Sequence, residues 1–152
     1  MIKLTSVLLF FTLMLQAEQV EVSADFFEAD EQTMTSILQG NVLLQKGEDT
    51  VHASTLTISF DAQNKPIKYL AEGQVNFNIK TNMQDFEGHA QSLLYNPKTH
   101  IYAVSGNAFL HDKKQDRKLY GERIMIDRNS GKSSIKGAKN RPVKFIFHVQ
   151  ED

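Results

Sequence analysis

Two short patterns have residue types that could act as a nucleophile or hold a phosphate, but both are incomplete. Ser133-Ser134-Ile135-Lys136 has the S-x-x-K spacing of a serine nucleophile and its lysine, a chemistry that also requires S-D-N and K-T-G partners. Neither partner occurs in the chain. Gly131-Lys132-Ser133 has the ending of a phosphate-binding loop, yet Ile126 stands where that loop requires its first glycine. We therefore expect neither a serine nucleophile nor a nucleotide site.

The histidines and carboxylates do not form a recognisable ligand set. The five histidines are His52, His89, His100, His111 and His148, and the smallest separation between them is 11 residues (100 − 89 and 111 − 100). Metal ligands must converge, which on strands favours pairs two residues apart or tight clusters. No acid lies inside an apolar stretch, so none is expected in the apolar surroundings of a general acid. The sequence predicts no catalytic residue, no metal and no cofactor, and hence no enzyme.

What remains is an apolar stripe, whose members alternate with polar residues along most of the chain. One face would collect Val20, Val22, Val42, Leu44, Leu56, Ile58, Val75, Phe77, Leu93, Tyr95, Leu110, Ile124, Ile126, Phe145 and Phe147. Such a stripe either fills an ordinary core or lines a groove for an apolar ligand, and composition does not distinguish the two.

These residues are positioned by a repeat of 33 residues (73 − 40 and 106 − 73). The repeated tripeptides are Gly40-Asn41-Val42, Gly73-Gln74-Val75 and Gly106-Asn107-Ala108. Each ends one apolar stretch and opens another. A second element, a small residue followed by polar residues and an apolar pair, recurs at 90–96 and 121–127, with a looser copy at 53–58. A fixed period of roughly 20 to 50 residues indicates a repeat architecture.

The period-two alternation predicts strands rather than helices. Turn signals separate the strands about every eight to twelve residues, and no segment has a helical period. We expect an all-β chain of antiparallel strands, in a sandwich, a barrel or a solenoid. The first strand is placed at Val20–Phe27 and the last at Val143–Val149, and each repeated glycine lies between two strands, as between Thr33–Gln39 and Asn41–Lys46.

Residues 1–17 have the features of a signal peptide, with Lys3 before an apolar run at 4–15 and Ala17 at the cleavage point. The run is shorter than the roughly 20 residues that span a bilayer. We therefore expect one exported domain at 18–152. The chain contains no cysteine, so this domain must rely on its core and backbone pairing. The net charge of the whole chain is −1, which gives no reason to expect a basic face for nucleic acid.

The order of the motifs resembles the OstA/LptA-like family, the periplasmic lipopolysaccharide (LPS) transport proteins. The matching segments are Leu38–Val42, His52-Ala53, Glu87–Ala90, Leu94-Tyr95, Ser105–Leu110 and Tyr120–Ile124. The resemblance extends from about Val20 to Val149, and Gln74 departs from the asparagine that is usual at that position.

The resemblance implies a half-open, twisted antiparallel β-jellyroll in the periplasm, with an interior that binds the acyl chains of lipid A. The stripe residues other than Ile126 would then be lipid-binding, with Val20, Val22, Phe77 and Tyr95 foremost. It also implies head-to-tail self-association through the first and last strands, which bridges an inner-membrane OstA-like export partner to the outer-membrane LPS translocon. Two alternatives stay open: a membrane-anchored partner of the same fold that keeps its N-terminal run, and a structural β-solenoid without lipid cargo.

Overall fold

The computed structural model describes residues 19–151, and within them the chain forms strands and no helix. The strands are β1 (Val20–Ser23), β2 (Phe26–Asp30), β3 (Thr35–Lys46), β4 (Asp49–Phe60), β5 (Pro66–Lys80), β6 (Asp85–Asn96), β7 (Ile101–Asp112), β8 (Arg117–Asp127), β9 (Ser133–Lys136) and β10 (Lys144–Ile146). The prediction of an all-β chain is confirmed. Accordingly, residues 19–151 contain no helix able to cross a membrane. The signal peptide expected at 1–17 lies outside the described residues.

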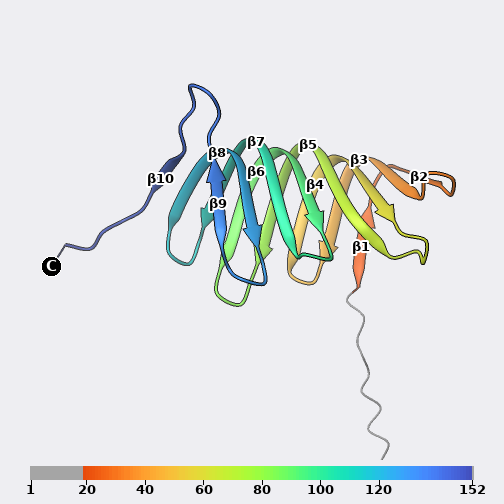
Figure 1. Cartoon of the computed structure of the whole chain (residues 1–152), viewed down its shortest axis with the longest axis horizontal. Coiled ribbons are helices and arrows are strands. Elements are labelled where there is room, and N and C mark those ends of the chain that lie inside the picture. Colours follow the sequence, from red (N-terminus) through yellow and green to blue (C-terminus); the bar gives the residue numbers. More distant parts are fainter. Residues whose placement is uncertain (1–18, 152) are drawn as a thin grey trace, which may run out of the picture.

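All the strands belong to one antiparallel sheet in which sequence neighbours mostly pair. The order is β1-β3-β4-β5-β6-β7-β8-β10, with β2 also paired to β3 and β9 to β8. The strands are stacked along the long axis of the molecule, with β2 near one end and β10 near the other (Figure 1). Each 33-residue repeat is therefore one hairpin: β3, β5 and β7 contain the repeated glycine, and β4, β6 and β8 contain the second repeated element.

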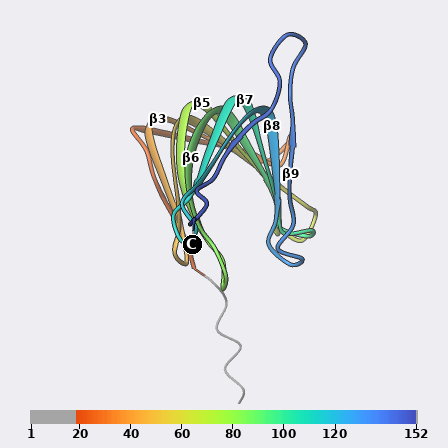
Figure 2. The same ribbon diagram turned by 90° about the vertical axis from the view of Figure 1, so that its left-hand side faces the viewer.

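Each long strand is bent near its middle, so the sheet forms two walls that meet along a crease (Figure 2). The glycine of each repeat lies at this bend with a left-handed backbone, at φ of +80°, +82° and +86° for Gly40, Gly73 and Gly106. The residue after each glycine is also left-handed. The strand pairing shifts register there, as between Gln39 and Val42. Two successive left-handed residues form a bulge that turns the strand, and glycine adopts this conformation without strain.

The expectation that each repeated glycine separates two strands is wrong. The bulge displaces the pairing locally but leaves the ladder intact on both sides, so the two expected strands at 33–39 and 41–46 become the two halves of β3. The expected first strand, Val20–Phe27, is instead divided, because it crosses the crease. β1 pairs with the second half of β3 and β2 with the first half. The expected last strand is shorter than predicted, since only Lys144–Ile146 pairs with β8.

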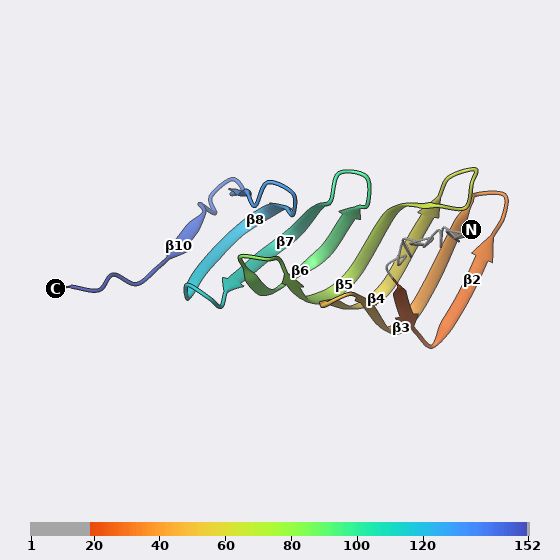
Figure 3. The same ribbon diagram turned by 90° about the horizontal axis from the view of Figure 1, so that it is seen from below.

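We call the wall that contains β2 and β9 wall A, and the wall that contains β1 and β10 wall B. Each wall is about six residues deep, which corresponds to about 20 Å at the rise of an extended strand. The side opposite the crease, which we call the mouth, is bordered by the turns of both walls (Figure 2). The turns of wall A are 31–34, 61–65, 97–100 and 128–132, and those of wall B are 47–48, 81–84 and 113–116. Figure 3 shows the strands from below, on the side of the mouth.

Packing at the crease adds a second requirement for glycine. A Cβ atom built on Gly73 would lie 2.6 Å from the Cβ atom of Ser54, on the neighbouring strand β4. The same relation recurs one repeat later, where a Cβ atom on Gly106 would lie 2.7 Å from that of Gln91. A side chain is therefore disfavoured at these glycines for two reasons: the backbone is left-handed, and the neighbouring strand is too close for a Cβ atom.

We predict that Gly73→Ala destabilises the fold by about 2 to 4 kcal/mol, because it combines left-handed strain with a steric clash. Gly131→Ala is the matched control. Gly131 has a similar φ of +72° but no atom within 4 Å of a built Cβ, so only the strain remains, about 1 to 2 kcal/mol. Urea unfolding of the two variants measures the difference. Equal losses would show that the crease tolerates a side chain.

Candidate functional site

The inner faces of the two walls form the candidate site. Alternate residues of each half-strand point inward, and their apolar side chains meet in one buried cluster. Wall A contributes Leu38, Leu56, Ile58, Tyr69, Ala71, Leu93, Tyr95, Tyr102, Val104, Ile124 and Ile126. Wall B contributes Val42, Leu44, Val51, Ala53, Val75, Phe77, Ile79, Phe86, Ala90, Ala108 and Leu110. The structure is thus a trough with an apolar interior.

The structure brings together most of the residues that the sequence assigned to a lipid-binding face. Those in the buried cluster are Val42, Leu44, Leu56, Ile58, Val75, Phe77, Leu93, Tyr95, Leu110 and Ile124. Val20 and Val22 are half-buried and pack against it.

Phe145 and Phe147 are not part of the cluster, contrary to expectation, and are 49% and 55% exposed. Phe145 pairs with Leu119 at the end of wall B, and its ring stacks on Phe147, 5.1 Å away between centroids. Alternation along the chain places these two rings on one side of an extended segment. Within residues 19–151 no opposite wall covers the two rings, because β10 leaves the body of the sheet here (Figure 1).

A small cavity of about 20 Å³ remains between the walls, bounded by Leu44, Lys46, Val51, Leu56, Tyr69, Ala71, Leu93, Tyr95 and Tyr102. This volume holds about one water molecule. The walls are therefore in contact over most of the interior, and a bulkier guest requires them to separate. Tyr69 and Tyr102 are inward-facing residues that the sequence analysis missed, because each lies in a continuous apolar run without alternation.

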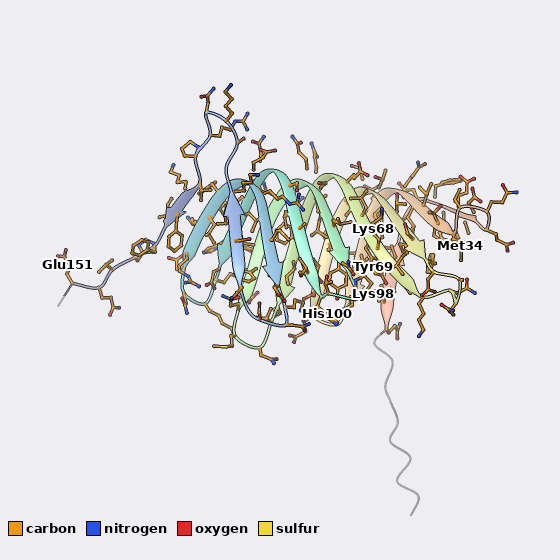
Figure 4. All side chains as sticks on the ribbon, viewed as in Figure 1. Met34, Lys68, Tyr69, Lys98, His100 and Glu151 are labelled. Atoms are coloured by element: carbon orange, nitrogen blue, oxygen red, sulfur yellow. The ribbon has the colours of Figure 1, made fainter. Side chains whose placement is uncertain are left out.

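Three tyrosines form a row across wall A, just inside the mouth. Tyr69, Tyr95 and Tyr102 are register partners on β5, β6 and β7. The ring centroids of Tyr95 and Tyr102 are 4.4 Å apart in a stacked arrangement, and Tyr69 lies 6.0 Å from Tyr95. The hydroxyl of Tyr95 bonds with Nδ1 of His100, 3.3 Å away in the mouth turn. Figure 4 shows Tyr69 on the strands above His100 and Lys98, which lie on the lower rim.

Contrary to the expectation that no acid enters an apolar face, Asp49 is 1% exposed. It directly follows Gly47-Glu48, which is typical of a hairpin turn, but β4 already begins at Asp49, which points inward like Val51 and Ala53. Its carboxylate accepts hydrogen bonds from the Tyr102 hydroxyl at 2.7 Å, from Nη1 of Arg128 at 2.9 Å and from the backbone N–H of Lys80 at 2.9 Å. Burial and the adjacent Asp49 charge raise the pKa of Tyr102, so its phenol stays a hydrogen-bond donor at physiological pH.

A second charged cluster lies on the outer face of wall B. Nε2 of His111 is 2.9 Å from Asp116 and its Nδ1 is 3.2 Å from Glu87. Bonding to Asp116, and secondarily to Glu87, raises the pKa of His111. Asp116 also lies 3.2 Å from Nε2 of His148 in the C-terminal segment. In residues 19–151 no group of three or more His, Asp or Glu side chains is arranged to hold a metal ion.

Comparison with known proteins identifies the architecture. The model of the family described as "LptA/(LptD N-terminal domain) LPS transport protein" matches residues 21–132, well over half of the chain. The structure is similar to a crystal structure of LptH from Pseudomonas aeruginosa, described as the LptA homologous periplasmic component of the conserved lipopolysaccharide transport device. The TM-score is 0.77 at 15% identity, over 87% of this chain and 96% of that one. No curated protein matches the sequence. The expected half-open β-jellyroll is confirmed.

The His111 cluster makes a pH-dependent contribution to stability. The raised pKa of His111 stabilises the fold fully below the unfolded value of about 6.5, and this contribution is lost as the pH rises through the folded value. The pKa values of Glu87 and Asp116 are lowered, chiefly by their bonds to His111. Their contribution is present above the unfolded carboxyl values and is lost as the pH falls through the folded ones.

We therefore predict that the cluster stabilises the protein most near pH 5.5 and less at pH 9. Urea unfolding at both pH values, compared between variants, measures this. His111→Gln should shrink the difference in unfolding free energy between the two pH values. His52→Gln, an exposed histidine on the same wall, should leave it unchanged. A pH difference that is the same in the wild type and in His111→Gln would contradict the assignment.

Proposed function

The chain belongs to the LptA/LptD N-terminal-domain family of LPS transport proteins, and on this premise we propose that it carries LPS through the periplasm. In this proposal residues 1–17 are removed on export, and the domain at 18–152 shelters the acyl chains of lipid A between its walls. The sugars and phosphates stay at the mouth, in water. The protein acts as a carrier rather than an enzyme, and an ATPase elsewhere supplies the free energy.

The observation that supports this proposal is the apolar trough itself. Each CH₂ group removed from water contributes about 0.8 kcal/mol, so a multiply acylated lipid does not cross an aqueous compartment at a useful rate unescorted. Both walls present apolar side chains inward, and the trough extends along the strand-stacking axis. A lipid that moves along this axis therefore remains in contact with apolar side chains.

The hydrogen-bond pattern of the sheet allows the walls to separate. Ladder hydrogen bonds join neighbouring strands, so they run along the trough within each wall rather than from one wall to the other. Opening at the mouth changes the angle at the crease and leaves the ladders paired. The apolar side chains exposed by this motion are the ones that acyl chains would cover, which offsets the cost of opening.

The two ends of the sheet support assembly with further copies and with partners. The outer edges of β1 and β2 at one end and of β9 and β10 at the other are the ends of the strand order. Unpaired strand edges favour the addition of another strand. Both ends also expose aromatic side chains: Phe26 and Phe27 on β2, and Phe145 and Phe147 near β10. We propose head-to-tail stacking, with an inner-membrane OstA-like export partner at one end and the outer-membrane LPS translocon at the other.

Photocrosslinking tests the cargo. A photoreactive phenylalanine analogue at Phe77, which is 2% exposed inside the trough, should form an adduct with purified LPS. The matched control is the same analogue at Asn76, the adjacent residue on β5, which is exposed and points to the opposite face. Mass spectrometry should detect the lipid adduct only from position 77. No adduct from position 77, or equal yields from both, would favour a packed structural β-solenoid without lipid cargo.

Complementation tests head-to-tail assembly. Deletion of residues 143–152 removes one end, and Phe26→Asp with Phe27→Asp charges the other. Phe26, Phe27 and residues 143–151 are exposed. Analytical ultracentrifugation should show each variant as a monomer, and an equimolar mixture should form a dimer that grows no further, because a heterologous contact needs one intact end from each partner. If either variant alone still self-associates as the wild type does, the stacking is not head-to-tail.

A further inference from the structure

The walls are joined at the mouth by three side chains, Asp49, Tyr102 and Arg128, which we call the latch. Asp49 begins β4 on wall B, Tyr102 lies on β7 in wall A, and Arg128 lies in the turn after β8 on wall A. Oδ2 of Asp49 accepts hydrogen bonds from both partners, at 2.7 Å from Tyr102 and 2.9 Å from Arg128. Nη2 of Arg128 also donates to the backbone carbonyl of Lys80 on wall B, at 3.0 Å.

Opening the trough must break these contacts. The remaining contact between the walls is largely apolar packing, which is non-directional and is replaced when acyl chains enter. The latch contacts are directional and span 53 and 79 residues of sequence. Removing one partner from a buried ion pair is costly because the other charge is left uncompensated. The latch therefore sets a large part of the barrier to opening.

The two charged members of the latch differ in what they keep when it opens. Oδ1 of Asp49 still accepts the Lys80 N–H, from its own wall, so the carboxylate retains a hydrogen-bond donor. Arg128, whose side chain is 26% exposed at the mouth, loses its carboxylate and needs a new anion. A guanidinium binds phosphate with two parallel N–H···O bonds, and phosphate is an anion that the proposed cargo presents at the mouth.

We propose that the latch is the entry gate of the trough and that Arg128 exchanges the Asp49 carboxylate for a phosphate on the lipid headgroup as the acyl chains enter. This inference rests on the proposed function and specifies its site. It makes Arg128 the residue that couples recognition of an anionic headgroup to separation of the walls. The competing interpretation is that the ion pair only stabilises the closed fold.

Arg128→Gln separates the two interpretations when binding of two probes is compared. The probes are lipid A with both phosphates and the same lipid A after removal of its phosphates, each presented in the same detergent micelles. We expect Arg128→Gln to lower the affinity for the phosphorylated probe about tenfold relative to the dephosphorylated one, because charge-assisted bonds to phosphate are lost. Lys132→Gln, a cation in the same turn with an exposed side chain, should change this ratio less than twofold.

Tyr102→Phe keeps Arg128 and removes one bond of the latch, so it tests the gate independently. It should speed the uptake of both probes. The chain has no native cysteine, so spin labels on Glu48→Cys and Lys98→Cys, on opposite rims, report the opening directly. The distance between the labels should increase when phosphorylated lipid A is added, and Tyr102→Phe should widen the distribution before lipid is present.

Three results would contradict the proposal that the latch is a gate. Arg128→Gln could weaken binding of both probes equally, as a purely structural ion pair predicts. Lys132→Gln could act as strongly as Arg128→Gln, as a diffuse positive potential predicts. The label distance could stay constant while lipid binds. If the wild-type protein binds neither probe, the proposed function itself fails and the gate with it.

Discussion

The left-handed backbone at Gly40, Gly73 and Gly106 is the constraint on which the rest of the structure depends. A flat sheet of strands this long would expose an apolar face that it could not cover. The bulge at each glycine folds that face onto itself, so one sheet supplies both walls of its own core. The glycines must recur on alternate strands and in line, because a single straight strand would interrupt the crease. This requirement explains the 33-residue period of the sequence.

Folding a sheet along a line across its strands separates two kinds of cohesion. Along the trough, every strand is held by ladder hydrogen bonds that stay in place when the walls move. Between the walls, cohesion comes from apolar packing, from Lys46 of wall B over the Tyr95 ring of wall A, and from the hydrogen bonds of the buried Asp49. A closed β-barrel has no such division, since opening it would break a ladder. The half-open form is thus stiff along the trough and compliant across its mouth.

Much of the fold could be predicted from the sequence, because strand alternation and repeat spacing are local signals. Val75 and Phe77 are placed on one face by alternation, and the structure buries both. The bends were missed because a glycine between two apolar stretches has the same pattern whether it separates two strands or bends one. Only the strand that pairs on both sides of the glycine distinguishes these cases, and its residues are remote in sequence. Phe145 was misplaced for a related reason, since alternation does not reveal where the opposite wall ends.

The polar part of the site was harder to anticipate. Asp49 follows Gly47-Glu48, a strong turn signal, and this concealed its inward position two residues before Val51. Its partners Tyr102 and Arg128 come from two different later segments. No spacing rule connects them, because the folded sheet brings them together across the mouth. Continuous apolar runs around Tyr69 and Tyr102 likewise gave no indication of which side chain points inward.

The hairpin repeat also separates the length of the trough from its cross-section. Duplication of one 33-residue unit would add two strands, and hence about 10 Å of wall, at the usual spacing between strands. Depth would not change, because it depends on the half-strand between crease and rim. Modular growth can therefore lengthen the trough while the depth of its interior remains the same.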